Sequence, residues 1–373
     1  MLQKTLSRIL GCALLLYGST ALAFTLISPP QEQLSPSNTI TDTSTLEPQV
    51  QAIAGTIRTQ LLSHRRPKSS EKVTQVGRML AANADASSRS DVNYLAAALN
   101  DPSGAGSASG GGGDSESLWI SATTNSLENE FSRTAFYGAT HNLLAGFDLT
   151  RSDKYVLGVA VGHEASNFVT TFNAGNERTR GFNLNPYFAL LLSDTWSLDL
   201  IGGYGRFNTR QSRTLGSITV PLGTVAVDSE FSSKRGFAST NLTNVSTWGD
   251  WKLTGSLGYL GSRREQDAYV ESNGSAVASA KQTSKQWNLL GEAAYGRGSA
   301  ETFVGAMYEH TRDPQKVQFA TGEQPANDPD SVLLTAGWRY VGKGLTGSFA
   351  FSSRQAQKQV TEYGISMMLR VDL

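Results

Sequence analysis

The last eleven residues of the chain, YGISMMLRVDL at 363–373, alternate between two kinds of side chain. Every second residue is apolar, and the residues between them are mostly small or charged. The apolar set of this terminal strand is Tyr363, Ile365, Met367, Leu369, Val371 and Leu373. Strict alternation predicts a β-strand, because successive side chains point to opposite faces of a sheet. One face of the predicted strand therefore meets an apolar medium and the other a polar one.

Similar alternating segments recur from Leu118 to the end of the chain, separated by turn residues. The clear segments are 143–149, 155–162, 182–192, 196–204, 251–259, 287–295, 332–340 and 345–351. Weaker patterns near Leu118, at 237–245 and at 303–310 bring the predicted number of strands to twelve, with the register of 237–245 left open. The fold class predicted from this pattern is all-β.

The connections between these segments alternate in length. Short ones lie at 151–154, 193–195, 248–250, 296–301 and 341–344, and long polar ones at 208–230, 262–284 and 311–330. An even number of strands with short turns at one end and long loops at the other predicts an antiparallel transmembrane β-barrel.

Aromatic residues on the apolar face support this interpretation. Trp196 and Tyr204 are eight residues apart on one face, and two other strands repeat the spacing. Eight residues span ~26 Å along a strand and ~20 Å after tilting, close to the ~25 Å apolar band between the two aromatic girdles of a barrel. The predicted girdle residues are Trp196, Tyr204, Trp251, Tyr259, Trp287, Tyr295 and Tyr340.

Charged residues fall on the opposite face of the same strands. The predicted lumen-facing residues are Asp148, Asp199, Lys252, Glu292, Arg339 and Arg370. In lipid, an Arg or Lys near the midplane would cost ~2–4 kcal/mol, so these positions are expected to face an enclosed lumen. In a closed cylinder the terminal strand pairs with the first, which leaves no open edge.

The N-terminus has the three parts of a secretory signal peptide. Lys4 and Arg8 precede the apolar run ILGCALLLYG, and Ala21-Leu22-Ala23 is a small-x-small cleavage site. We therefore predict that residues 1–23 are removed. Cys12 is the only cysteine, so cleavage would leave a mature chain with no thiol and no disulfide. Acylation of Cys12 is the alternative, but the main apolar run follows this residue rather than preceding it.

Residues 24–116 contain no strand-like alternation. The Pro-, Ser- and Thr-rich stretch 29–48 is predicted to be disordered. Helical spacing follows at Val50, Ile53, Ile57 and Leu61, then at Val73, Val76 and Leu80, and a short helix is expected at 91–99. Residues 103–113, SGAGSASGGGG, are predicted to form a flexible tether.

The strand sequences resemble the translocator domain of bacterial autotransporters over roughly 117–373. The resemblance rests on SLWISA at 117–122, NLLAGFDL at 142–149, LGVAVGHEAS at 157–166, SDTWSLDLIGGYGRF at 193–207 and the terminal strand. It implies a twelve-stranded barrel in the bacterial outer membrane, with a helix in its lumen and an N-terminal passenger that it carries to the cell surface. It also implies contact with outer-membrane lipid, with periplasmic chaperones and with the barrel-assembly machinery, which reads the terminal strand.

On this resemblance residues 24–90 are the candidate passenger, and residues 91–116 are the candidate plug helix with its tether. Two features depart from the family: the chain ends in Leu373 rather than Phe or Trp, and residues 24–90 are too short for a β-helical passenger. The alternative is a pore or structural barrel that does not secrete and keeps its N-terminal helices in the periplasm. We expect a monomer.

The sequence offers little chemistry beyond this. Lys plus Arg and Asp plus Glu both number 32, so no basic excess points to nucleic acid. The four histidines, His64, His141, His163 and His310, have no metal-ligand spacing, and no cofactor motif is present. Catalysis at the outer rim by His163 with Glu164, or by His310 with Glu309 and Asp313, is the weaker alternative to interfacial histidines. We expect no enzyme.

Overall fold

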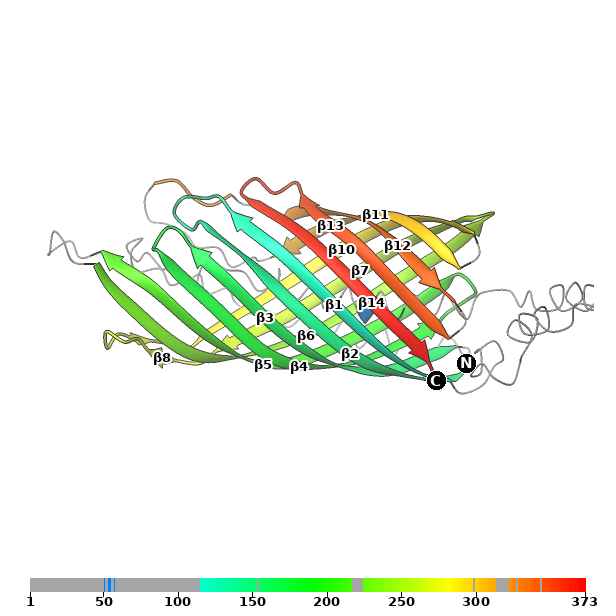
Figure 1. The fold of residues 1–373 in the computed structure, drawn as a ribbon, viewed down its shortest axis with the longest axis horizontal. Helices are drawn as coiled ribbons and strands as arrows, with labels where there is room; N and C mark the ends of the chain where they lie inside the picture. The colour runs from blue at the N-terminus through cyan, green and yellow to red at the C-terminus, as the bar shows by residue number, and fades with distance from the viewer. Residues whose placement is uncertain are drawn as a thin grey trace, which may run out of the picture.

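The computed structural model describes residues 115–373 except 153, 217–223, 298, 313–321, 327 and 343, together with Val50, Ile53, Ala54 and Ile57. Twelve antiparallel strands close into one barrel (Figure 1). They are β1 (Ser115–Asn129), β2 (Phe136–Ser152), β3 (Tyr155–Thr170), β4 (Gly175–Leu191), β5 (Trp196–Gly216), β6 (Thr224–Trp248), β7 (Trp251–Gln266), β10 (Ala280–Arg297), β11 (Ala300–Arg312), β12 (Asp330–Val341), β13 (Leu345–Gln355) and β14 (Val360–Asp372). The prediction of a twelve-stranded all-β barrel is confirmed, including the weakly patterned β1, β6 and β11.

Closure is made by the first and last strands. β1 pairs with β14 in antiparallel register from Ser117 opposite Asp372 to Asn129 opposite Val360. Every other barrel strand pairs with the barrel strands next to it in sequence. Because the sheet closes on itself, no barrel strand presents an unpaired edge to its surroundings.

The long connection predicted at 208–230 is largely strand, and that part of the prediction is wrong. β5 continues to Gly216 and β6 begins at Thr224, with Ser212 opposite Asp228. Alternation between buried and exposed side chains persists here, but the exposed residues are polar apart from Ala226. The segment was predicted to be a loop because it lacks an apolar face. It is instead a pair of strands that extends past the apolar band.

The predicted loop 262–284 also contains more strand than expected. β7 runs to Gln266 and β10 begins at Ala280, and between them β8 (Tyr269–Val270) pairs with β9 (Ala276–Val277). Tyr269 stacks on Phe231 of β6 at 4.7 Å between ring centroids. A buried ion pair of 2.9 Å joins Glu271 to Arg213 of β5. The hairpin is therefore fastened to the buried face of the β5–β6 extension, at the end of the barrel away from the C-terminus (Figure 1).

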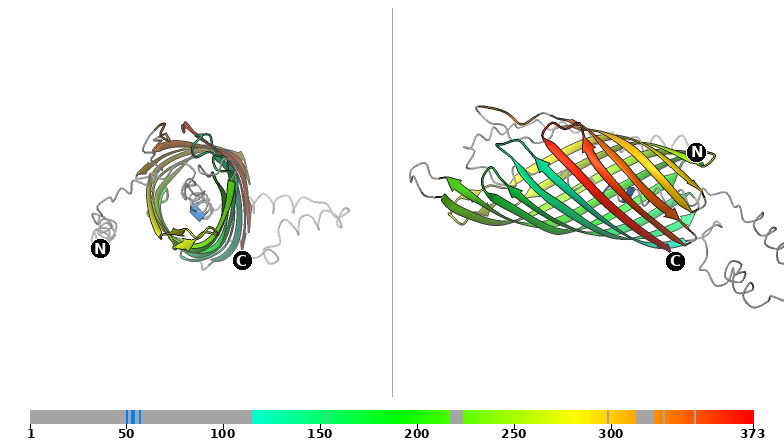
Figure 2. Two further views of the ribbon diagram at one scale, coloured as in Figure 1. Left: turned by 90° about the vertical axis from the view of Figure 1, so that its left-hand side faces the viewer. Right: turned by 45° about the horizontal axis from the view of Figure 1, so that its top comes forward.

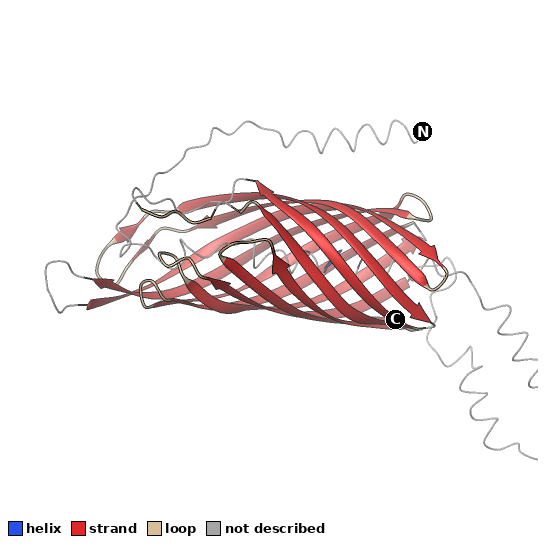
Figure 3. Cartoon of the chain, turned by 90° about the horizontal axis from the view of Figure 1, so that it is seen from above, coloured by secondary structure: helices blue, strands red, loops and turns tan. Residues whose placement is uncertain are grey.

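Aromatic residues lie at two levels on the outward face. Tyr259 pairs with Trp287 and their rings lie 4.6 Å apart, while Trp251 pairs with Tyr295 at 5.1 Å. Trp196, Tyr204 and Tyr340 also point outward, with 43%, 53% and 36% of their surface exposed. Between the two levels the outward face is apolar, and the described loops lie at the two ends of the barrel (Figure 3).

In the described part of the chain, no helix is both long enough and apolar enough to cross a membrane.

We expect a charge placed midway between the two aromatic levels to destabilise the barrel in lipid. Leu200 lies on the outward face of β5, four residues from both Trp196 and Tyr204, and is 45% exposed. Leu200→Arg should lower the free energy of unfolding by ~2–4 kcal/mol in lipid vesicles. Urea titration followed by the mobility of the folded band on unheated gels measures this.

The matched control is Asp194→Arg in the short turn before Trp196, where the side chain is exposed. Its effect should stay within about 0.5 kcal/mol, as for other surface substitutions. Equal losses for the two variants would mean that Leu200 does not face hydrocarbon.

Candidate functional site

One wall of the barrel interior holds a helical piece of the same chain. Val50, Ile53, Ala54 and Ile57 are helical, and their spacing places them on one helix face. Ile53 and Ile57 are only 0% and 1% exposed. The four residues form a single buried apolar cluster with Trp119, Leu144, Val156, Ala160, Tyr187, Ala189, Ile201, Phe237 and Leu260 of the barrel. Figure 2 shows the described helical residues inside the ring of strands.

The barrel residues of this cluster all lie on β1 to β7, and we call them the apolar wall. A barrel lumen is normally lined by polar residues, because it is wet. Apolar side chains facing water would forgo about 1.5–3 kcal/mol for each large residue that could be buried instead. The apolar wall and the helix face therefore stabilise each other.

Sequence spacing predicted the helix but not its position. Val50, Ile53 and Ile57 fall within residues 24–90, the range predicted as passenger. The predicted plug at 91–116 lies outside the described residues, apart from Ser115 and Glu116, which begin β1. The sequence did contain a signal that a helix packs inside the barrel. Apolar residues such as Leu144 and Ile201 lie on the same strand faces as Asp148 and Asp199.

The opposite side of the interior carries charges that are paired with each other. Arg339 of β12 donates to Glu292 of β10 at 3.2 Å and lies 3.7 Å from Glu301 of β11. Lys252 of β7 forms an ion pair with the same Glu301. Three of the residues predicted to face the lumen thus come together around a carboxylate that was not predicted.

A second ionic cluster lies further along the same side. Arg354 of β13 is buried, donates to Glu362 of β14 at 2.7 Å and also pairs with Glu309 of β11. Ser331 donates to Glu309 at 2.9 Å. We call the residues of these two clusters the ionic wall. Its opposite charges hold each other at short range, as buried charges require.

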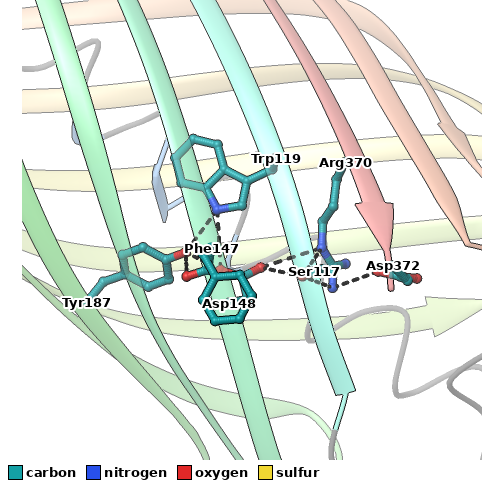
Figure 4. A network of polar contacts seen from close by, with 7 residues as sticks. All are labelled: Ser117, Trp119, Phe147, Asp148, Tyr187, Arg370 and Asp372. Atoms are coloured by element: carbon teal, nitrogen blue, oxygen red, sulfur yellow. Dashed lines mark hydrogen bonds and ion pairs between the residues drawn. The ribbon is translucent and has the colours of Figure 1, made fainter.

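A polar network joins the last strand to the first strands at the closing seam (Figure 4). Arg370 of β14 donates to the Ser117 hydroxyl at 3.0 and 3.1 Å, and Ser117 donates to Asp148 of β2 at 3.0 Å. The Asp148 carboxylate also accepts from Trp119 of β1 at 3.3 Å and from the hydroxyl of Tyr187 on β4. Four strands are tied together by groups that are each nearly inaccessible.

Two glycines make room for the aromatic members of this network. A Cβ atom on Gly146 would come within 2.3 Å of the Trp119 ring, and one on Gly158 within 2.2 Å of the Tyr187 ring. The rings lie directly against the backbone of β2 and β3 as a result. Trp119 and Tyr187 were not predicted as lumen residues, and only their position in the alternation distinguishes them from girdle aromatics.

Further buried polar contacts line the interior beyond the apolar wall. Asp199 of β5 accepts from the Asn241 amide of β6 at 2.6 Å. Arg235 of β6 pairs with Glu164 of β3 at 2.9 Å and lies over the Phe207 ring, 4.4 Å from its centroid. The interior is therefore filled by contacts between side chains from different strands.

Residues 118–352 match the family model described as the autotransporter beta-domain. The chain belongs to the autotransporter family. It is similar in fold to the translocator domain of autotransporter NalP from Neisseria meningitidis, with a TM-score of 0.57, 14% identity and coverage of 75% of this chain and 94% of that one. It is also similar to the beta domain of the Bordetella autotransporter BrkA, with a TM-score of 0.55, 16% identity and coverage of 69% and 99%. No curated protein matches the chain.

Family membership places this autotransporter barrel in the bacterial outer membrane, with its outward face in lipid and a translocator role. The six apolar residues of the terminal strand lie on that outward face, each exposed by between 41% and 59%. The backbone N–H of Leu373 donates to the carbonyl of Glu116 at 2.8 Å, so hydrogen bonding across the seam reaches the final residue.

Among the described residues, the two rim histidines of the autotransporter barrel do not meet the carboxylates suggested by sequence, because Glu164 and Glu309 point inward to arginines. His163 lies outward against Phe182, at 4.9 Å between ring centroids, while Glu164 points inward to Arg235. His310 Nδ1 lies 2.8 Å from Oδ1 of the exposed Asp330 carboxylate, and the Tyr308 hydroxyl donates to the same oxygen. Asp313 lies outside the described residues. Among the described residues no group of three His, Cys, Asp or Glu could hold a metal.

We expect loss of the Arg370 cation to destabilise the closed barrel strongly. Arg370→Met would leave Asp148 buried without its nearest cation, and removing one partner of a buried ion pair costs ~3–5 kcal/mol. The double variant Arg370→Met/Asp148→Asn removes both charges and should recover most of this loss. The urea midpoint of the folded gel band measures the three proteins.

An exposed ion pair supplies the comparison. Glu265, whose side chain is 40% exposed, lies 2.7 Å from Arg263, and Glu265→Gln should cost less than about 1 kcal/mol. If Arg370→Met were as mild as Glu265→Gln, the seam network would not be holding the barrel closed.

Proposed function

We propose that this autotransporter keeps residues 50–57 of its own chain in the lumen as a resident plug, with residues 24–49 displayed on the cell surface and residues 58–114 on the periplasmic side. The observation that carries the proposal is the buried cluster between the helix face and the apolar wall. The N-terminal residues 1–23 act as the export signal and are absent from the mature protein.

The topology of the barrel supports this direction. β1 begins beside the end of β14, at the same end as the short connections after β2, β4, β6 and β12. In outer-membrane barrels the short turns are periplasmic. The chain therefore enters β1 from the periplasm, and a segment passing through the lumen before it has its other end at the surface.

The competing function is a non-secreting pore or structural barrel with its N-terminal region in the periplasm. It is compatible with a helix inserted from the periplasmic end, since residues 58–114 are long enough to reach back to β1 in either case. What favours display is membership of a family of translocators.

We propose in addition that the barrel is a monomer, inserted with the help of periplasmic chaperones and the barrel-assembly machinery, which would contact the terminal strand. The regular alternation from Tyr363 to Leu373 supports this, because it offers an unbroken outward apolar face to lipid. We propose no catalytic role for the rim histidines, in keeping with the transport function of the family.

We expect cysteine labelling of intact cells to show residues 24–49 outside. The only native cysteine, Cys12, lies in the predicted signal peptide, so the mature chain provides a background without thiols. Ser37→Cys should react with a membrane-impermeant maleimide on intact cells, because the proposed path carries it to the surface. Ser70→Cys should react only after the outer membrane is permeabilised.

The two cysteines control for each other. Protection of Ser37→Cys on intact cells, together with labelling after permeabilisation, would show that the segment is periplasmic and would overturn display. Labelling of Ser70→Cys on intact cells would overturn the assignment of 58–114 to the periplasm.

We expect disruption of the helix face to open the barrel. An unpaired carboxylate within an apolar cluster costs several kcal/mol, so Ile53→Asp/Ile57→Asp should expel the helix from the lumen. In planar bilayers the wild-type protein should conduct poorly and the variant should show a large, steady conductance.

Leu34→Asp/Ile40→Asp is the matched control, since it makes the same chemical change in the segment proposed to lie outside. It should leave the conductance at the wild-type level. A wild-type barrel that conducts as freely as the Ile53→Asp/Ile57→Asp variant would favour an open pore over a plugged translocator.

A further inference from the structure

Five cationic side chains gather on the outward face of three neighbouring strands, just beyond the outer aromatic level. They are Arg178 and Arg180 of β4, Arg206 and Arg210 of β5, and Lys234 of β6, and we call them the outer basic patch. All five occupy even-numbered positions that continue the lipid-facing series toward the outer end of the barrel. Arg180 lies two residues beyond Phe182 in that direction on β4, and Arg206 lies two residues beyond Tyr204 on β5.

The strand register forces these cations together. Arg178 lies directly opposite Arg210, Phe182 opposite Arg206, and Arg206 opposite Lys234. Neighbouring strands are only ~4.7–4.9 Å apart, and like charges directly opposite each other destabilise a sheet. Repulsion within these two opposed cation pairs, one across β4 and β5 and one across β5 and β6, therefore lowers the stability of the protein when no anion is bound.

Carboxylates of the barrel offset little of this charge. Glu230 contacts Arg210 at 3.0 Å, but both side chains are more than half exposed, where such pairs contribute little. Glu265, opposite Lys234, contacts Arg263 and Lys281 instead. Within the described residues, no carboxylate lies within ion-pair distance of Arg178, Arg180 or Arg206. The described carboxylates therefore leave most of the positive charge of the patch uncompensated.

The position of the patch indicates what kind of anion it meets. Phe182 is 65% exposed and lies one outward position from Arg180, with Leu184 beyond it toward the membrane. A ligand at this level would place acyl chains against Phe182 and Leu184 and an anionic headgroup against the guanidinium groups. Arg side chains bind phosphate through paired N–H donors, which suits them to a phosphorylated headgroup.

The patch is confined to one side of the barrel. On β1, β12 and β13, the outward residues beyond the apolar band are uncharged or acidic, as at Ser126, Glu128, Asp330 and Ser353. General attraction to an anionic membrane surface would be satisfied by cations around the whole circumference. Further outward cations lie on β7, β10 and β11, at Arg263, Lys281, Lys285 and Arg312, and Glu265 contacts two of them. The outward cations are therefore gathered on β4 to β11 and are absent from the described outward faces of the seam strands, which favours binding on that half of the barrel.

We propose that the outer basic patch binds a phosphate-bearing lipid of the outer leaflet, with the phosphates held by Arg178, Arg180 and Arg206 and the acyl chains lying along Phe182 and Leu184. The bound phosphates relieve the repulsion between the opposed cations. This proposal is separate from the proposed lumenal plug and from the proposed surface display, and it does not depend on where residues 24–49 lie.

The test compares the full-length barrel with the triple variant Arg178→Gln/Arg180→Gln/Arg206→Gln. Both are reconstituted in phosphatidylcholine nanodiscs containing lipid A with its phosphates or lipid A without them, and retained lipid is counted by mass spectrometry. The wild type should retain the phosphorylated lipid and not the dephosphorylated one. Removing three cations at an anionic lipid surface should weaken retention by about 100-fold.

The charge-matched control is Lys154→Gln/Arg312→Gln/Lys358→Gln, which removes three cations elsewhere and should retain the lipid like the wild type. Equal retention by wild type and patch variant would overturn the proposal, as would an equal loss in the control, because attraction would then be general. Competition by inorganic pyrophosphate as effective as lipid A would identify a free phosphate site and overturn the lipid assignment.

Thermal unfolding keeps the test independent of folding defects. In detergent without lipid A, the patch variant should be as stable as the wild type or more stable, since repulsion has been removed. Phosphorylated lipid A should then raise the melting temperature of the wild type only. A patch variant that gains the same stabilisation from the lipid would contradict the proposal.

Discussion

The structure depends on the fact that a backbone in hydrocarbon has no water with which to hydrogen-bond. Each strand must find a partner on both sides, and twelve strands can do so only by closing the first on the last. The pairing of β1 with β14 is therefore the contact on which the other eleven strand pairings depend, because it removes the two open edges of the sheet. The seam does not rest on backbone hydrogen bonds alone, because Arg370, Ser117 and Asp148 link the closing strands through buried side chains.

Closure creates an interior, and the interior must be filled or hydrated. Here it is divided. The wall formed by β1 to β7 is apolar where it meets the helix face of Val50, Ile53, Ala54 and Ile57. The wall formed mainly by β10 to β14 carries Arg–Glu and Lys–Glu pairs that neutralise each other. A helix with one apolar face has a single favourable position in such a lumen, so the division of the walls selects its orientation about the barrel axis.

Alternation allowed the barrel and the two faces of its strands to be predicted, because a closed single sheet has only an inside and an outside. It failed where outward residues are polar or where a large aromatic residue points inward. Beyond Tyr204 the outward residues become polar, so the β5–β6 extension read as a loop. Phe237 points inward, which left the register of β6 open. The helical spacing of Val50, Ile53 and Ile57 could be recognised in the sequence. The surface against which this apolar face packs could not, since many apolar surfaces can bury it.

The two halves of the barrel differ outside as well as inside. β4 to β6 contribute to the apolar wall, extend furthest at the outer end, carry the β8–β9 hairpin and bear the outer basic patch. The strands at the seam are shorter, as β13 shows, and the described outward faces of these strands lack such cations. The inner face of these taller strands is also held by the buried ion pair between Arg213 and Glu271. Binding of lipid headgroups to the outward face of β4 to β6 would restrict the motion of the same side of the barrel that binds the helix.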